Sequence, residues 1–126
     1  MELAWTVFLH FEAPEYSQQG IETFRAYVHD RAQMEKLNIW GAYLDEGLAG
    51  MLAVRASHIS LFFVREKYQN MGIGRALFQQ AASEMGRPIT VNSSPYAVEI
   101  YRRLGFETTA SEQLEDGIRY APMQLQ

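Results

Sequence analysis

The sequence contains no cysteine. Disulfide bonds, thiolate metal sites and a cysteine nucleophile are therefore excluded. The three histidines, His10, His29 and His58, lie far apart and form no His-x-x-x-His pair, so we expect no metal cofactor. No apolar run approaches the roughly 18 residues that a membrane helix needs, and the first residues lack the basic start of a signal peptide. These absences predict a cytoplasmic protein with no membrane partner.

Basic residues are also few, with 11 Lys and Arg against 15 Asp and Glu and a formal net charge of −4. Binding to nucleic acid depends on cations that neutralise phosphates, so we expect no nucleic-acid partner, whereas a cationic substrate is compatible with this balance. The 126 residues are 48% apolar, which is ordinary globular usage. Length and composition predict one domain over residues 1–126.

Strand and helix signals are interleaved along the chain. Apolar runs predict strands at Asn38–Leu44, Leu48–Arg55, Ile59–Val64, Ile89–Val91, Phe106–Thr108 and Ile118–Leu125. Helical spacing and cap residues predict helices from Ser17 to near Leu37, from Ile73 to Gly86 and from Ser94 to Gly105, with a polar loop at Ser111–Gly117. The pattern predicts an α/β fold with a mixed sheet flanked by helices. Leu3–Phe11 fits either an alternating strand or a helical face.

A glycine turn joins a predicted buried strand to a predicted helix, with Gln69, Gly72 and Gly74 at its centre. Glycines allow a ligand to approach the backbone closely, and the first amides of the helix point outward at the positive end of its dipole. Such a turn can hold a pyrophosphate, with Arg75 at the rim. The turn does not match two other phosphate-binding motifs. Arg75-Ala76 stands where a P-loop has Gly-Lys-Ser/Thr, and the third glycine of a dinucleotide fingerprint is missing.

Two blocks together resemble the GCN5-related N-acetyltransferase (GNAT) superfamily. The first is Gln69-x-x-Gly72-x-Gly74 after a strand, and the second is Val91–Phe106, which ends in Tyr-x-x-Leu-Gly-Phe. The strand at His58–Val64 and the segment Phe8–Gly20 are similar to a small bacterial branch with no assigned substrate. The resemblance implies a single-domain GNAT-like fold and acetyl-CoA as co-substrate.

The superfamily normally opens with a strand, for which this chain has no room. We therefore expect Leu3–Phe11 to be helical and the edge of the sheet near Trp40 to be uncovered. An uncovered edge invites self-association, here into a homodimer.

The resemblance also implies roles for individual residues. It assigns the pyrophosphate to the amides of Asn70–Arg75 and main-chain pairing with the pantetheine arm to Phe62–Val64. The implied cofactor-binding set is Phe62, Phe63, Val64, Gln69, Asn70, Met71, Gly72, Ile73, Gly74, Arg75 and Asn92. Tyr101 corresponds to a tyrosine that protonates the departing coenzyme A sulfur. The structural alternatives are that Tyr101 and the two phenylalanines are core residues and that Asn92 forms a turn.

His58 matches a position at which other members carry a glutamate or histidine base. An ordinary histidine pKa near 6.5 suits proton removal at neutral pH; the alternative is a histidine bonded to the preceding turn. Glu12, Glu15, Tyr16 and Glu22 lie in the segment that forms a wall of the acceptor site in the superfamily, and they could attract an amine or be a solvated acidic face.

The resulting hypothesis is an N-acetyltransferase, an acyltransferase that moves acetyl from acetyl-CoA to a primary amine of a small molecule or peptide. With no cysteine for an acyl-enzyme, the amine would attack the thioester directly in a ternary complex. The alternative is a catalytically silent acyl-CoA-binding module.

Overall fold

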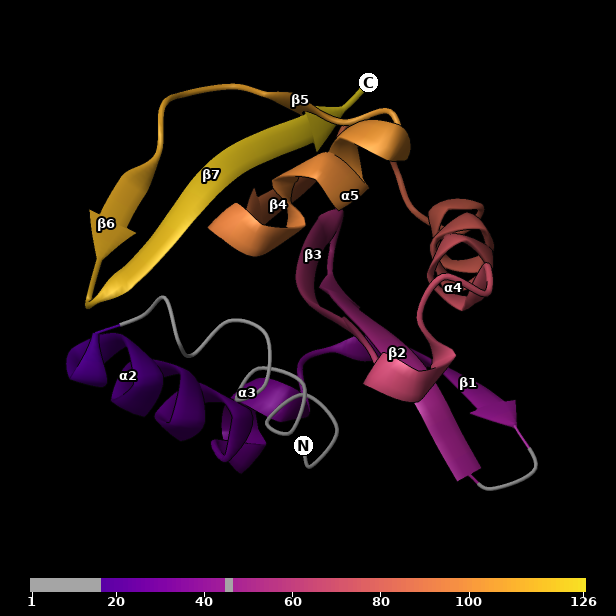
Figure 1. Cartoon of the computed structure of the whole chain (residues 1–126), viewed down its shortest axis with the longest axis horizontal. Helices are drawn as coiled ribbons and strands as arrows, with labels where there is room; N and C mark the ends of the chain where they lie inside the picture. The colour runs from indigo at the N-terminus through magenta and orange to yellow at the C-terminus, as the bar shows by residue number, and fades with distance from the viewer. Residues whose placement is uncertain (1–16, 45–46) are drawn as a thin grey trace.

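The structure is a computed structural model that describes residues 17–44 and 47–126 (Figure 1). Its helices are α2 (Gln18–Val28), α3 (Arg31–Met34), α4 (Ile73–Ala82) and α5 (Val98–Arg103), with short 3-10 turns η2 (Glu66–Tyr68) and η3 (Pro95–Ala97). Its strands are β1 (Asn38–Leu44), β2 (Gly47–Arg55), β3 (His58–Val64), β4 (Ile89–Ser93), β5 (Glu107–Thr108), β6 (Gln113–Glu115) and β7 (Ile118–Leu125).

One mixed sheet organises the described chain, with strand order β1-β2-β3-β4-β7-β5 and β6 paired to β7. The pairing of β3 with β4 is parallel, whereas the other pairs are antiparallel. One hydrophobic cluster joins the sheet to α4 and α5, and a second, which contains Val28, joins the sheet to α2. The helices therefore cover both faces of the sheet, which confirms the predicted α/β fold.

The predicted strands are all present, and two local expectations are wrong. The helix expected from Ser17 to near Leu37 ends at Val28, because Asp30 caps a new helix by accepting a hydrogen bond from the Gln33 amide at 3.2 Å. The expected loop at Ser111–Gly117 contains β6. The helix expected at Leu3–Phe11 lies outside the described residues; within them, β1 is the last strand on its side of the sheet.

An extra residue in β3 changes which way its side chains point. Ala53 pairs with Leu61 and Val54 with Ile59, so that Ser60 has no partner in the register. Ile59 consequently packs in the cluster on the α4 side, whereas Leu61 packs in the cluster on the α2 side. A regular strand would place both residues on one face. The bulge thus reverses the facing of β3 just before Phe62.

The two central strands separate soon after they meet. β3 and β4 pair only at His58↔Thr90 and Ile59↔Val91. In Figure 1, the start of β7 lies at the lower left while the hairpin ends of β1 and β2 lie at the lower right, so the two halves of the sheet spread apart. This divergence leaves the β4-facing side of Phe62–Val64 without a strand beside it in the described sheet.

α2 is tied to the turn between β6 and β7. The Thr23 hydroxyl donates to the Asp116 carbonyl at 2.8 Å. Asp116 (φ 52°) and Gly117 (φ 79°) are both left-handed, which is the geometry of a tight hairpin turn. A Cβ at Gly117 would overlap the backbone nitrogen of Gly20. The turn therefore packs directly against the backbone of the first turn of α2, with no room for a side chain at Gly117.

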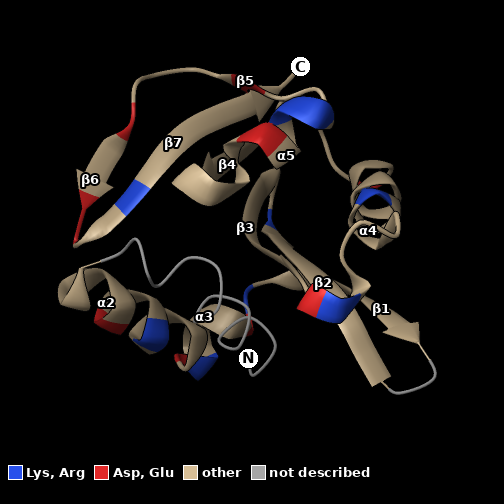
Figure 2. Cartoon of the chain, viewed as in Figure 1, with Lys and Arg blue, Asp and Glu red and all other residues tan. Residues whose placement is uncertain are grey.

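Charges of both signs are scattered over the described helices and turns (Figure 2). α2 carries Glu22 beside Arg25, and α5 carries Glu99 beside Arg102 and Arg103. No helix in the described part of the chain is both long enough and apolar enough to cross a membrane.

Gly117→Ala should destabilise the fold, because the new Cβ meets the backbone of α2 and the left-handed conformation itself costs about 1–2 kcal/mol. We expect a loss of at least about 1 kcal/mol in the free energy of unfolding, measured by urea denaturation. Gly86→Ala is the matched control, since its Cβ would lie an ordinary 3.4 Å from Ser57 Oγ. Equal midpoints for the two variants would contradict this account of the turn.

Candidate functional site

The loop after β3 is fixed by hydrogen bonds at both ends. The Arg65 amide donates to the Ala49 carbonyl at 2.8 Å. The Gln69 side-chain amide donates to the Val64 carbonyl at 2.9 Å. These bonds hold the chain against the end of β3 while it turns toward α4, and they account for the glutamine that begins the glycine turn.

The start of α4 is open to a ligand. Asn70 (φ 63°) and Gly72 (φ 82°) adopt left-handed conformations that reverse the chain, and Gly72 caps α4 with no side-chain hydrogen bond. A Cβ at Gly72 would have no atom within 4 Å. The first amides of a helix have no partners within it, and they carry the positive end of the dipole. This helix start is therefore suited to an anion.

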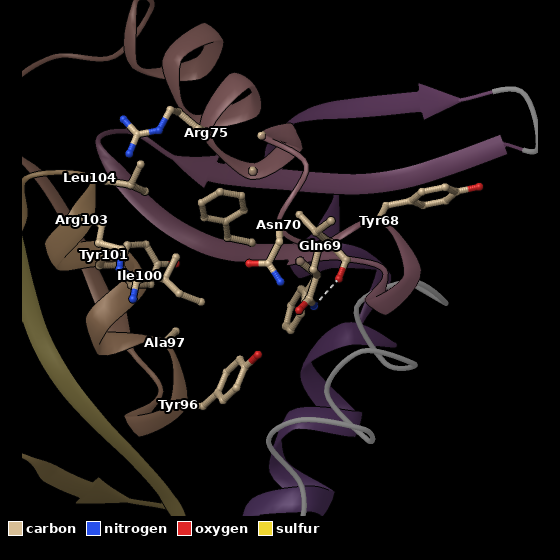
Figure 3. Close-up of a pocket in the computed structure, with 15 residues that line it drawn as sticks. Tyr68, Gln69, Asn70, Arg75, Tyr96, Ala97, Ile100, Tyr101, Arg103 and Leu104 are labelled. Atoms are coloured by element: carbon tan, nitrogen blue, oxygen red, sulfur yellow. Dashed lines mark hydrogen bonds between the residues drawn. The ribbon is translucent and has the colours of Figure 1, made fainter.

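A cavity of about 290 Å³, the cofactor-side cavity, lies between this loop and α5. Figure 3 shows Gln69 and Asn70 on one side of it and Tyr96 on the other. Arg75 reaches it from α4 and Arg103 from α5, so two cations on different helices stand at its edge. The lining residues are Phe62, Phe63, Val64, Tyr68, Gln69, Asn70, Gly72, Gly74, Arg75, Tyr96, Ala97, Ile100, Tyr101, Arg103 and Leu104.

A second cavity of about 210 Å³, the α2-side cavity, is lined in part by Phe24 and Tyr27 of α2. Its other lining residues are Ile59, Ser60, Leu61, Phe62, Phe63, Val91, Asn92, Ser93, Ser94, Ala97, Tyr101 and Ile118. Both cavities are lined by Phe62, Phe63, Ala97 and Tyr101. The two cavities therefore adjoin where β3 and β4 diverge, one toward the glycine turn and the other toward α2.

Tyr101 stands at the junction of the two cavities. Its side chain is buried, and its ring makes edge contacts with Phe62 (6.1 Å between centroids) and Phe106 (5.4 Å). Its carbonyl accepts hydrogen bonds from the Leu104 and Phe106 amides, which ends α5. Tyr101 is thus both a core residue and a lining residue of each cavity. Its burial in the core is therefore compatible with a chemical role.

His58 lies apart from both sets of lining residues. Its Nδ1 and the Thr90 hydroxyl share a hydrogen bond of 2.8 Å. Thr90 lies between Ile89 and Val91, which face α4, so the pair faces α2. Partial burial lowers the pKa of the His58 imidazole below its ordinary value. The side chain is therefore mostly neutral at pH 7. It lies four positions before Phe62 in β3, roughly 10–13 Å away along a strand that contains the bulge.

The structure brings together most of the residues that the sequence singled out. Of the expected cofactor-binding residues, Asn92 lines the α2-side cavity, and Met71 and Ile73 line neither. Met71 is 63% exposed. Glu22 is an exposed residue that accepts a hydrogen bond from Gln18 and lines neither cavity. Glu12, Glu15 and Tyr16 lie outside the described residues.

Sequence reasoning missed several lining residues. Tyr96, Ile100 and Arg103 lie inside the block that ends in Tyr-x-x-Leu-Gly-Phe. In that block, helical spacing places Ala97 and Leu104 on the same face as Tyr101, and this could have identified both as lining residues. Phe24 lies on the apolar stripe of α2, and such a stripe is ordinarily read as core. Nothing in the sequence distinguished a cavity wall from a packed face there.

Comparisons with known proteins identify the architecture. A family model described as an acetyltransferase (GNAT) domain matches residues 12–126. No curated protein matches the chain. Among solved structures, a GCN5-related N-acetyltransferase from Rhodopseudomonas palustris has a TM-score of 0.80 at 18% identity, covering 98% of this chain and 85% of that one.

Two further structures share the fold at low identity. The ribosomal-protein-S18-alanine N-acetyltransferase from Escherichia coli has a TM-score of 0.59 at 22% identity, covering 98% of this chain and 85% of that chain. An aminoglycoside 6'-N-acetyltransferase complexed with coenzyme A has a TM-score of 0.62 at 12% identity, covering 98% and 88%.

Proposed function

The chain belongs to the GNAT acetyltransferase family, and on that premise we propose that it moves acetyl from acetyl-CoA to a primary amine by direct attack in a ternary complex. Family membership supports acyl-CoA-dependent N-acetyl transfer in general. The observation that carries the finer proposal is the pair of adjoining cavities with Tyr101 at their junction. Such an arrangement lets two substrates meet from opposite sides of the sheet, which is what a direct transfer requires.

The cofactor-side cavity has the groups that acetyl-CoA needs. The amides of Asn70–Arg75 would bind the pyrophosphate, with Arg75 and Arg103 adding charge at the edge. The β4-facing main-chain groups of Phe62–Val64 would pair with the amides of the pantetheine arm, because no strand lies beside them in the described sheet. An aminoglycoside 6'-N-acetyltransferase with this fold forms a complex with coenzyme A, which supports coenzyme A as the ligand of this chain.

The chemical step needs one proton donor and one acceptor. The amine nitrogen attacks the thioester carbonyl carbon, the C–S bond breaks, and the phenol of Tyr101 donates its proton to the departing thiolate. The reference pKa values, about 10 for the phenol and about 8.5 for a thiol, make this transfer uphill without help from the surroundings. Asn92, which lines the α2-side cavity, would bind the cofactor or an ordered water.

His58 remains our proposal for the base, acting through water. Its face of the sheet is the one that α2 covers, and its neutral imidazole can accept a proton at pH 7. The separation from Phe62 exceeds hydrogen-bond reach, so a chain of waters is required. Its bond to Thr90 leaves one ring nitrogen for that chain.

Gly72→Glu should weaken acetyl-CoA binding, because it places a negative side chain at the helix start that would bind the pyrophosphate. We expect at least about a tenfold increase in the dissociation constant, measured by calorimetry. Gly72→Ala imposes the same backbone strain without the charge, and it should bind nearly as the wild type does. Unchanged affinity in a folded Gly72→Glu variant would place the site elsewhere.

Tyr101→Phe should lower kcat by about 100-fold or more while acetyl-CoA affinity stays nearly unchanged, since the ring contacts survive and the proton donor is lost. Coenzyme A release detected as free thiol measures kcat, and calorimetry measures affinity. A wild-type rate in this variant would remove Tyr101 from the mechanism. Acetyl-CoA binding by the wild-type protein without turnover of any amine would favour the acyl-CoA-binding module.

His58→Ala should lose activity near pH 7 and recover partly at higher pH, where free amine is abundant. In the wild type, activity should fall as the pH drops below about 6.5 and through the lowered pKa of His58, because protonation removes its lone pair. His29→Ala, at the exposed C-cap of α2, is the control and should keep the wild-type pH profile. A loss independent of pH would make His58 a structural partner of Thr90.

A further inference from the structure

The α2-side cavity is almost free of charge. Its described lining contains no lysine, arginine, histidine, aspartate or glutamate. The polar groups in that lining are the side chains of Ser60, Asn92 and Ser94, the tyrosine hydroxyls and the main chain, while the Ser93 hydroxyl is turned to the Ser94 carbonyl at 2.8 Å. A cavity of this kind recognises the body of a ligand by apolar contact rather than by ion pairing.

α2 supplies an aromatic wall to the cavity. Phe24 and Tyr27 are three residues apart and therefore lie on the same face of the helix. The Phe24 ring meets the Phe63 ring edge-on at 6.0 Å, and Phe63 is itself 7% exposed. Phe24 is thus held in one orientation by a buried neighbour. Ile118 of β7 adds a branched aliphatic side chain to the lining.

None of the described carboxylates lines the cavity, and those on the neighbouring elements α2 and β6 are exposed or hydrogen-bonded. Glu22 on α2 is exposed and accepts from Gln18 at 3.3 Å. Glu115 in β6 accepts from the Tyr120 hydroxyl at 3.1 Å. A cationic group inside the cavity would therefore lose its hydration without gaining a counter-ion from the described residues, which is unfavourable. The same lack of a counter-ion favours the neutral form of an amine, which is the nucleophile.

The cavity is also small. Its volume of about 210 Å³ is below the range of about 300–1,000 Å³ that is typical for drug-sized ligands. A compact molecule with one ring or one branched chain fits this volume.

We propose that the acceptor is a small monoamine with an aromatic or branched apolar body and no second charged group, bound as the free base. This inference rests on the proposed acetyl transfer and names its acceptor class. The body lies against Phe24 and Tyr27, and the amine points to the junction beside Phe62 and Tyr101. The neutral nitrogen attacks the thioester carbonyl carbon, its proton leaves to water, and the thiolate departs protonated by Tyr101.

The test on the wild-type protein compares matched amines at saturating acetyl-CoA, with coenzyme A release as the readout. The acceptors are phenethylamine, 1,4-diaminobutane and a tetrapeptide that begins with phenylalanine. We expect kcat/KM for phenethylamine to exceed that for either of the others by at least about tenfold, because a second cation or a peptide chain must be desolvated or left outside the cavity.

A charge introduced into the aromatic wall tests the same inference independently. Tyr27→Glu should shift the ratio of kcat/KM toward 1,4-diaminobutane by at least about tenfold, since it supplies the missing counter-ion. Ala26→Glu places the same charge on the exposed side of α2 and should leave the ratio unchanged. Circular dichroism and acetyl-CoA calorimetry report whether each variant is folded.

The outcomes separate the acceptor class from the reaction. Faster turnover of the diamine or the tetrapeptide by the wild-type protein overturns the acceptor class and leaves acetyl transfer in place. Equal shifts in Tyr27→Glu and Ala26→Glu also overturn it, because the effect is then not local to the cavity. Acetyl-CoA binding with no turnover of the three acceptors overturns the acceptor class, and the same failure over a broad panel of amines overturns acetyl transfer as well.

Discussion

The site depends on main-chain hydrogen bonds that two strands do not make. β3 and β4 pair at two positions and then separate, although backbone groups inside a protein rarely lack partners. The Val64 carbonyl accepts a hydrogen bond from the Gln69 side chain, and in the proposed complex the pantetheine amides would supply partners to main-chain groups of Phe62–Val64 that face the gap. Both cavities exist because this pairing ends early, and Tyr101 fills the space between the separating strands on the α5 side.

The sheet separates two kinds of chemistry. On the α4 side, a helix start and two arginines create positive potential near the glycine turn. On the α2 side, aromatic and aliphatic side chains line a cavity without described charges. A polyanionic co-substrate and a neutral acceptor can thus occupy adjacent spaces without competing for the same groups. Among the described residues, both spaces share Phe62, Phe63, Ala97 and Tyr101, so the proposed transfer would take place beside these four residues.

Much of this arrangement could be predicted from the sequence. Apolar alternation located the strands, and the two glycines marked the turn into α4, where the structure shows Gly72 in a left-handed conformation. The facing of His58 could not be predicted, because strict alternation puts residues 58, 60 and 62 on one face and the unpaired Ser60 reverses that order. A one-residue bulge has no clear sequence signature when serine provides it. The wall formed by Phe24 was hidden for a similar reason, since a helix that packs on a sheet and a helix that lines a cavity show the same stripe.

The tie between α2 and the β6–β7 turn ends on main-chain oxygens, those of Asp116 and Gly117. Every amino acid supplies such an oxygen, so the turn can exchange its Asp116 side chain during evolution and still hold the helix. α2 contributes Phe24 and Tyr27 to one cavity and nothing to the other. For the proposed transfer, substitutions on this one helix would therefore change the acceptor without changing the described lining of the cofactor-side cavity, which makes α2 a natural place for paralogues to diverge.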